Sequence, residues 1–505
     1  MSIVAGVDSS TQSCTVELRD ADTGELRGSG RAPHPVTFPP VSEQHPDDWW
    51  NAFELALGRA VSNAALPAHE IRAISVAAQC HGLVMLDANG QPLRSAKLWN
   101  DTESAPQARE MVTHLGAATW ADSIGSVPTA AFTITKLAWM AQHEPSLLSA
   151  TRHVLVPHDY LTFRLTGRTV TDRSDASGTG YYAAHESAWR FDLLSRYVSD
   201  EVAWDVLLPE VLGPAQAAGL IRPRVADRLG LSRAVIVGPG AGDQHAGALG
   251  IGTREGDVLY SLGTSGVVLT ESRTPVFDHL GLVDGVADAA GGFLPLVSTL
   301  NSTKVTDAVG RWLDVDLEQL SELALHAPDK DERPVFMAFL DGERTPNRPD
   351  ATGLLGGLST STTREDIARS AYEGVLFGLV AGHEAIRNAG APADGTVTVV
   401  GGGAKSPAYR QLLSDILGAP LLTKDVPEAT ARGACIQAAA ILQTESIPVV
   451  RDSWDPRVIS VTEPRGSRVE IARARYDALV KGPGSPRLAP PATGDMRPKR
   501  RPSGD

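Results

Sequence analysis

Two aspartates in this sequence follow apolar strands and stand in turns of small residues, a setting suited to phosphate chemistry. Asp8 closes the apolar segment 3–7, and Asp243 follows the glycine-rich residues 240–242 and is expected to begin a helix. Phosphoryl transfer needs a divalent metal on the nucleotide and a group that accepts the proton of the attacking hydroxyl. One carboxylate could organise the metal while the other serves as the base. The alternative for Asp243 is a helix N-cap, a common position for aspartate.

Three turns rich in glycine, serine and threonine could bind an anion without carrying a net positive charge. They are the turn after Asp8, residues 263–266 and residues 401–403, and each follows an apolar strand. Such turns point several backbone N–H groups at one spot, and their small side chains let a phosphate approach closely. Any single turn of this kind could merely reverse the chain, so the three together indicate a phosphate site.

Other well-known catalytic motifs are absent from the sequence. It contains no GxxxxGK[S/T], no HExxH and no GxSxG, which excludes a P-loop enzyme, a zincin and an α/β-hydrolase elbow. The formal net charge of −14 disfavours broad nucleic-acid binding. Three distant cysteines suit a reducing compartment, and no signal peptide or apolar run of ~18 residues occurs. The sequence therefore predicts a cytoplasmic enzyme without a membrane segment.

Strand and helix patterns alternate along the chain, which favours an α/β architecture. A helix with one apolar face is expected from Pro407, with Ser406 as its N-cap. The expected strands include residues 71–76, 154–156, 235–237, 258–260, 267–269 and 397–400.

The hairpin at residues 258–269 resembles the one at the start of the chain, which indicates two related halves. The alternative, that any two hairpins look alike, stays open at this point. We expect an N-terminal domain at 1–245 on the sugar and phosphate side, a nucleotide-side domain at 246–480, and a disordered tail at 481–505.

A set of short segments identifies the chain as similar to the FGGY family of carbohydrate kinases, of the actin and hexokinase superfamily. Each segment is short, but their common order along the chain is specific. Within the family, the sequence is most similar to xylulokinases, through residues 79–82 above all. The segments are residues 6–8, 98–101, 136–139, 157–161, 242–243, 261–266, 342–346 and 401–404.

The resemblance implies two actin-like (ribonuclease H-like) domains around a nucleotide cleft, with ATP and Mg²⁺ as cofactors. Asp243 would accept the proton, and Asp8 would lie near the magnesium, with water between them. The implied ATP-binding residues are Ser10, Thr11, Gln12, Gly263, Thr264, Gly402 and Gly403. The implied sugar-binding residues are Cys80, His81, Asn100, Asp101 and Gln244, with a loop cap as the alternative for Asn100 and Asp101.

Four positions depart from the pattern that the resemblance implies. Ser10 replaces a usual glycine, and Gln12 replaces a smaller residue. Their larger side chains leave less room for a phosphate to approach the backbone there. Cys80 stands where xylulokinases commonly have methionine, and Gln244 where asparagine is more usual. The last two departures bear on which sugar is bound.

The expected reaction is ATP-dependent phosphorylation of a sugar, most simply D-xylulose to D-xylulose 5-phosphate. Ribulose, glycerol and gluconate are the alternative acceptors within the family. A non-catalytic actin-like sugar-binding module and a sugar-nucleotide hydrolase are the alternatives of other classes. Sugar and ATP are the expected partners, without nucleic acid or membrane, and the sequence leaves a homodimer open.

Overall fold

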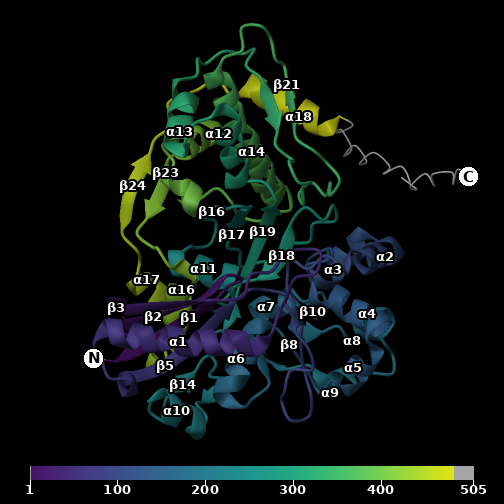
Figure 1. The fold of residues 1–505 in the computed structure, drawn as a ribbon, viewed down its shortest axis with the longest axis vertical. Coiled ribbons are helices and arrows are strands. Elements are labelled where there is room, and N and C mark those ends of the chain that lie inside the picture. Colours follow the sequence, from purple (N-terminus) through teal and green to yellow (C-terminus); the bar gives the residue numbers. More distant parts are fainter. Residues whose placement is uncertain (1, 483–505) are drawn as a thin grey trace, which may run out of the picture.

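Two seven-stranded mixed sheets, one in each half of the chain, form the centre of this computed structural model (Figure 1). The structure describes residues 2–482, so the predicted tail lies outside the described residues from residue 483 on. The first sheet has the order β13 (Gly219–Leu220), β14 (Ile236–Val237), β5 (Ile71–Ala78), β1 (Ile3–Ser9), β2 (Ser13–Asp20) and β3 (Leu26–Pro33), with β15 (Ala241–Gly242) also beside β5. The second has the order β18 (Asp284–Ala287), β19 (Phe293–Thr299), β17 (Gly266–Thr270), β16 (Val258–Leu262), β22 (Val397–Val400), β23 (Leu421–Lys424) and β24 (Val458–Thr462).

The two sheets repeat one topology around their opening hairpins. β1 pairs antiparallel with β2 and parallel with β5. In the second sheet, β16 pairs antiparallel with β17 and parallel with β22. The similarity between the hairpins therefore extends to the next strand in each sheet, which pairs parallel with the first strand of the hairpin. This shared order supports two related halves over a chance resemblance of two hairpins.

Helices cover both faces of each sheet, as the apolar pattern of the strands requires. Along β1, Ile3 and Val7 point to the core beneath α1 (Pro46–Ala64) and α6 (Pro157–Thr166), because successive side chains alternate between faces. Val4 points to the opposite face, where α11 (Asp243–Ile251) and α16 (Ala429–Gln443) pack. One face of the second sheet packs against α12 (Thr303–Leu313), α14 (Arg364–Asn388) and α15 (Pro407–Leu417), and its other face packs against α11.

The remaining elements complete the two halves. A helical region beside the first sheet has its own apolar cluster and contains α2 (Ala105–Leu115), α3 (Ala117–Ile124), α4 (Thr133–His143), α5 (Pro145–Ala150), α8 (Phe191–Tyr197) and α9 (Trp204–Leu207). The other helices are α7 (Arg173–Ser177), α10 (Pro223–Leu229), α13 (Leu317–His326), α17 (Ile447–Ser453) and α18 (Glu470–Lys481). Short two-stranded pairs are formed by β4 (Glu43–Gln44) with β7 (Ala96–Lys97), β6 (Val84–Leu86) with β8 (His153–Leu155), β9 (Val170–Asp172) with β12 (Glu210–Leu212), β10 (Tyr182–Ala183) with β11 (Ala188–Trp189), and β20 (Val335–Met337) with β21 (Leu354–Gly356).

Two outcomes concern predicted local features. The α15 helix begins at Pro407 with Ser406 at the N-cap, as predicted, but the Ser406 hydroxyl donates to Ser321 Oγ (3.3 Å) instead of capping the helix. The division of the chain at residue 245 stays a prediction.

The helix α16 comes late in the sequence, within the predicted nucleotide-side domain, yet it packs on β1 and β5 of the first sheet (Figure 1).

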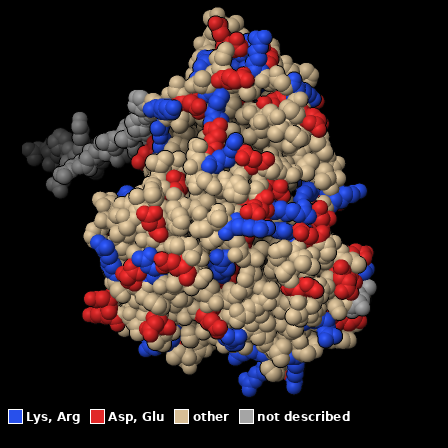
Figure 2. All heavy atoms as spheres, turned by 180° about the vertical axis from the view of Figure 1, so that it is seen from behind, with Lys and Arg blue, Asp and Glu red and all other residues tan. Residues whose placement is uncertain are grey.

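Charged side chains are mixed over the face of the molecule shown in Figure 2. Lys and Arg lie among Asp and Glu there, without a continuous basic area on that face. Within residues 2–482, no helix combines the length and the apolar character that crossing a membrane would require.

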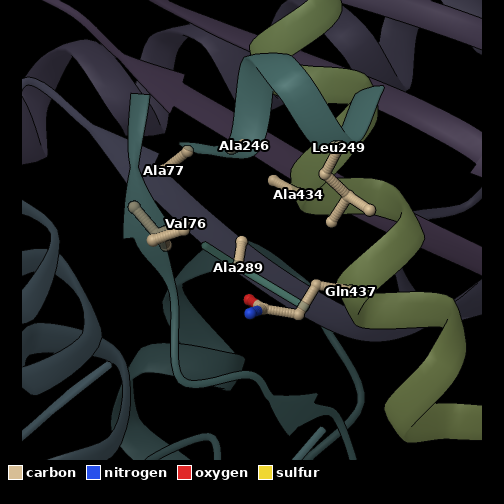
Figure 3. A pocket seen from close by; sticks show the side chains of 9 residues that line it. Val76, Ala77, Ala246, Leu249, Ala289, Ala434 and Gln437 are labelled. Carbon is tan, nitrogen blue, oxygen red and sulfur yellow. The ribbon is translucent and has the colours of Figure 1, made fainter. Parts of the chain in front are cut away.

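Backbone contact between α11 and α16 depends on glycines. A Cβ atom on Gly433 would lie 1.8 Å from Ala246 O, and one on Gly250 would lie 1.9 Å from Ala429 O. Figure 3 shows side chains of both helices and of β5 converging on an apolar gap, which has no room for the centre of a water molecule. The first residue of α11 is Asp243, so this packing sets the position of that carboxylate.

Replacing Gly433 by alanine should force the two helices apart, because the new methyl group meets backbone atoms that cannot turn away. Overpacking of this kind typically costs about 1–3 kcal/mol. We expect Gly433→Ala to lower the midpoint of thermal unfolding by several degrees and to reduce activity. Gly247→Ala is the matched control in the same helix pair, since its Cβ would meet only Thr430 Oγ1 at 3.5 Å. Equal stability of the two variants would contradict this account.

Candidate active site

The Asp8 carboxyl group lies at the end of β1, half-buried and close to other acidic groups. Its Oδ1 accepts a hydrogen bond from Ser10 Oγ. Burial raises the pKa of Asp8 to about 7, against the effect of the Ser10 hydrogen bond, and the nearby Asp243 and Glu428 raise it further. Asp8 and Asp243 therefore lie in one electrostatic environment, as the chemistry predicted for them requires.

Asp243 is the first residue of α11 and follows the N-cap residue Gly242, so the N-cap alternative for Asp243 is wrong. Its Oδ1 accepts from Gln244 N (2.8 Å) and lies 3.4 Å from Cys80 Sγ. Burial raises the pKa of Asp243 to about 6, although the hydrogen bonds from Cys80 and Gln244 oppose the rise. A carboxylate of this pKa is ionised at neutral pH and is a stronger base than an exposed aspartate.

The turn before Asp243 is fixed from α16. Gln437 Nε2 donates to Gly240 O (3.0 Å), and Gly240 N donates to Gln437 Oε1 (3.1 Å). Thr430 Oγ1 donates to Asp243 O at 3.2 Å. Gly240 has φ +90°, and a Cβ there would lie 2.4 Å from His158 Nδ1, so only glycine fits. The position of the carboxylate is therefore set by α16 and by the glycines of its own turn.

The loop after β5 carries His81, which follows the Asp243 contact Cys80 in the chain. His81 has φ +65°, its N–H donates to Asp175 Oδ1 (3.3 Å), and its carbonyl accepts from Thr133 Oγ1 (3.0 Å). Its ring stacks on Phe132, with centroids 5.3 Å apart. Burial lowers the pKa of His81 to about 3, so the ring is neutral. Nδ1 is buried against Gly178 without a well-formed hydrogen bond to the described residues, and its contact with a sugar hydroxyl stays a prediction.

Asn100 and Asp101 differ in how their side chains are used. Asn100 Oδ1 is buried without a hydrogen-bond partner in the described part of the chain. Asp101 is fully buried, and its Oδ2 accepts from Ser42 N (2.9 Å) and contacts Lys97 Nζ (3.4 Å). Its Oδ1 accepts from Glu103 N (3.1 Å). This geometry favours the loop-cap alternative for Asp101, while Asn100 stays a predicted sugar ligand.

A chain of contacts joins the first turn to the hairpin of the other half. Trp99 Nε1 donates to Thr11 Oγ1 (2.9 Å), and the Arg344 guanidinium lies 5.9 Å from the Trp99 ring centroid. The neighbouring Glu343 accepts from Leu300 N and from Asn301 Nδ2. Ser302 N in turn donates to Thr264 O at 3.2 Å. From the sequence, residues 342–346 had no assigned role beyond the family resemblance. The structure shows that they help to bridge the two halves, through long-range contacts that local sequence patterns do not reveal.

The predicted nucleotide-side residues lie together around Leu262. Gly263 O accepts from Thr303 N (3.0 Å), so the turn lies against the N-terminus of α12. Thr264 is exposed, and a Cβ on Gly402 would meet nothing within 4 Å. Gly403 is buried, and its Cβ would lie 2.7 Å from Leu262 Cβ. Thr264 and Gly402 are thus open to a ligand, whereas Gly403 lies against the neighbouring strand.

In the first turn, the polar groups are already partly engaged. Ser10 O lies 2.9 Å from His34 Nδ1, and Thr11 O accepts from Gln44 Nε2 (2.9 Å). Gln12 is exposed. Hydrogen bonds therefore fix the turn by its carbonyl groups, which leaves its N–H side for a phosphate, and the roles of Ser10, Thr11 and Gln12 stay predictions.

The acidic groups near Asp8 fit a hydrated divalent cation. Hard cations such as Mg²⁺ prefer oxygen ligands and keep several waters. Asp8 and Glu428 offer carboxylates without a resident cation in hydrogen-bond contact among the described residues. Among residues 2–482, Glu43, Asp101 and Glu103 have carboxylate oxygens within 4.8 Å of one another, but they already surround Lys97 Nζ and do not need a metal.

Comparison with known proteins identifies the family. The N-terminal and C-terminal domain profiles of the FGGY family of carbohydrate kinases match residues 3–250 and 258–442. The chain belongs to the FGGY family of carbohydrate kinases. A curated relative, xylulose kinase of Streptomyces coelicolor, is 42% identical over 90% of this chain and 91% of its own length. Xylulose kinase of Haemophilus influenzae is 33% identical over 86% and 89%.

Solved structures agree with this assignment. The crystal structure of xylulose kinase from Bifidobacterium adolescentis superposes with a TM-score of 0.85 at 36% identity, covering 94% of this chain and 99% of that one. Glycerol kinase of Plasmodium falciparum has a TM-score of 0.82 at 20% identity, which shows a shared fold alone. The predicted α/β fold of actin-like halves is confirmed. As an FGGY kinase, the protein is a phosphotransferase that uses ATP as phosphoryl donor and an alcohol group as acceptor.

The raised pKa of Asp8 predicts a cost to stability that asparagine should remove. The folded protein keeps the Asp8 proton up to about pH 7, whereas an unfolded chain loses it near 3.9. This proton therefore stabilises the fold at low pH, and the contribution is lost as the pH rises through about 7. Without nucleotide or metal, Asp8→Asn should unfold at a higher temperature than wild type at pH 8, with a smaller difference at pH 5, where part of the proton's contribution remains.

Thermal unfolding at both pH values measures this effect. The exposed Asp200→Asn serves as the control and should show no pH-dependent difference. An Asp8→Asn variant less stable than wild type at pH 8 would mean that the carboxylate forms a net stabilising interaction.

Proposed function

We propose that this FGGY kinase transfers the γ-phosphoryl group of ATP to the terminal hydroxyl of D-xylulose, giving D-xylulose 5-phosphate. One observation carries the proposal: the Asp243 carboxylate lies 3.4 Å from the thiol of Cys80, in the loop that also holds His81. The base and the predicted sugar loop are thus in direct contact. A hydroxyl held by His81 would lie within reach of Asp243, which would take its proton as the oxygen bonds to phosphorus.

The choice of sugar depends on sequence similarity, because the fold does not discriminate. A gluconate kinase from Lactobacillus acidophilus has the same TM-score of 0.85 at 22% identity as the xylulose kinase structure has at 36%. The curated relatives at 30–42% identity bear the name xylulose kinase. Neutral His81 and the unpartnered Asn100 Oδ1 offer the acceptors and donors that a polyol requires. Gln244, exposed beside Asp243, is proposed to contact a further hydroxyl.

Magnesium would neutralise charge on the phosphates when it is bound. Asp8 would hold it, with water between them, and Glu428 adds negative charge beside it. The turns at Thr264 and Gly402 would receive the nucleotide. Since the acidic groups repel free phosphate, the nucleotide is expected to bind as its metal complex.

Asp243→Asn tests the role of the base. The amide has nearly the same shape but cannot accept the hydroxyl proton, so turnover should fall by about two orders of magnitude or more. Sugar affinity should change little, because the sugar loop is intact. A coupled ADP assay gives turnover, and calorimetry gives the sugar affinity. Near-normal turnover would refute the assigned role.

A panel of acceptors tests the sugar. We expect the highest kcat/KM with D-xylulose when it is compared with L-ribulose, D-ribulose, glycerol and gluconate in the ADP assay. A higher kcat/KM with another acceptor would mean that this acceptor, and not D-xylulose, is the substrate of the same phosphoryl transfer. ADP release that does not depend on any sugar would indicate a hydrolase instead, and the absence of ADP release would indicate a sugar-binding module.

A further inference from the structure

A buried ionic cluster lies directly behind the sugar loop and is not used by the chemistry described above. His158 Nε2 is 3.2 Å from Asp159 Oδ1, 3.3 Å from Asp172 Oδ1 and 3.7 Å from Asp175 Oδ2. All four side chains are at most 3% exposed. His158 belongs to α6, whereas Asp172 precedes α7 and Asp175 lies within it, so the cluster joins two elements.

The four groups of this cluster cannot all keep the charge that each would carry alone in water at neutral pH. A neutral histidine with three ionised aspartates would bury three negative charges around one point, and uncompensated buried charge is very costly. Protonation of His158 provides the nearest counter-charge. Burial lowers the pKa of His158, but Asp159, Asp172 and Asp175 outweigh burial and raise it to about 9. The ring is therefore an imidazolium at neutral pH.

The hydrogen bonds indicate which aspartates are ionised. Asp172 accepts from Ser174 N (2.7 Å) and from Asp175 N (3.1 Å), which favours its ionised form. One Asp175 oxygen accepts from His81 N, but the other has no hydrogen-bond partner among the described residues. A protonated Asp175 would leave fewer buried negative charges unpaired. Burial accordingly raises the pKa of Asp175 well above its usual value, whereas His158 and the N–H groups hold that of Asp172 below it.

The short helix α7 connects this cluster to both sides of the active site. Asp175 holds the backbone of His81, and a Cβ on Gly178 would lie 2.2 Å from the His81 ring. Ser174 Oγ accepts from Gly242 N (3.4 Å), the residue before Asp243. Ser177 Oγ accepts from Ala287 N (2.9 Å) of β18 in the second sheet. Displacement of α7 would therefore move the sugar loop and the base together.

We propose that His158 is a positioning residue whose protonated ring holds α7, and through it the sugar loop and the turn of Asp243, in the geometry that transfer requires. The ring touches neither substrate nor reacting atoms in this scheme. Its positive charge is the functional property, since it attracts the ionised Asp172 at the start of α7 and so keeps that helix beside α6.

The proposal has a pH consequence that follows from every titratable group facing the ring. These groups are Asp159 on α6, Asp172 and Asp175 around α7, and His245 on α11, whose own pKa burial lowers to about 4. Because the pKa of His158 is raised in the folded state, its contribution is complete below about 6.5 and is lost as the pH rises through about 9. Activity should therefore decline on the alkaline side together with the order of α7.

Substitutions that separate charge from shape test this role. His158→Gln removes the charge, and we expect kcat/KM for the sugar to fall at least tenfold while KM for ATP stays within twofold. His158→Lys restores a positive charge with a higher pKa, so it should recover part of the activity and move the alkaline decline to higher pH. The assay uses whichever acceptor of the panel is phosphorylated fastest. A matched control, His153→Gln, removes a half-buried histidine on β8 outside the cluster and should keep the wild-type pH profile.

A titration followed by NMR tests the charge without any sugar. In protein labelled with ¹³C at histidine Cε1, the resonance missing from the His158→Lys sample should stay in the imidazolium position until about pH 9. A resonance that titrates at or below 6.5 would overturn the proposal, whatever the acceptor proves to be. Wild-type pH profiles in both His158 variants, with losses that only follow their thermal stability, would also overturn it.

Should His158→Gln fail to fold, two aspartate variants give the same answer. Asp175→Asn imitates a protonated carboxyl group, whereas Asp172→Asn removes an ionised one. We expect the Asp172 variant to lose at least tenfold more activity than the Asp175 variant. Equal losses would contradict the charge assignment.

Discussion

The withdrawal of two carboxyl groups from water, at Asp8 and Asp243, is the constraint on which the rest of this structure depends. Both groups have raised pKa values because burial penalises their charged form, and the charge of Asp243 makes Asp8 still more costly to ionise. A fold gains nothing from this arrangement by itself. The arrangement becomes favourable only when a cation and a polyphosphate bind together. The two buried carboxylates therefore destabilise the free protein, and the same charges favour the binding of a metal–nucleotide complex.

Such a site needs a scaffold that does not relax to relieve the repulsion. Two devices provide it here. The glycine contacts between α11 and α16 bring backbones so close that neither helix can shift alone, and Gln437 fixes the turn before Asp243 through two hydrogen bonds. On the other side of the base, α7 ties the sugar loop to the same turn. The carboxylate is thus fixed from both sides by elements far apart in sequence.

Local sequence patterns were sufficient for the parts of the fold that obey short-range rules. The strand at 397–400, the helix that begins at Pro407, and the two hairpins all follow from apolar runs and turn residues. The placement of α16 on the first sheet could not be read in this way, because an alanine-rich helix suits either sheet. Ser406 has the correct residue type for a cap but bonds to Ser321, a partner 85 residues away. Likewise, Asp101 has a residue type suited to sugar binding, yet Ser42 and Lys97 engage its carboxylate. The family's ordered segments located the site, whereas the long-range partners decide what each residue in it is free to do.

Three acidic clusters among the described residues meet the same electrostatic problem, and they do so in two opposite ways. Behind the sugar loop, three aspartates surround a resident cation, the His158 ring, so that part of the site keeps its geometry whether or not a ligand is present. Around Glu43, Asp101 and Glu103, Lys97 has the same role and also stacks 4.0 Å from the Trp139 ring centroid. Asp8, Asp243 and Glu428 have no such partner in hydrogen-bond contact among residues 2–482. The charge of the exposed Arg31 lowers the pKa of Asp8 and of Glu428 without a hydrogen bond, which leaves their carboxylates free for the metal that the nucleotide brings. The distribution of internal cations therefore separates the acids that hold the scaffold from the acids that take part in the reaction.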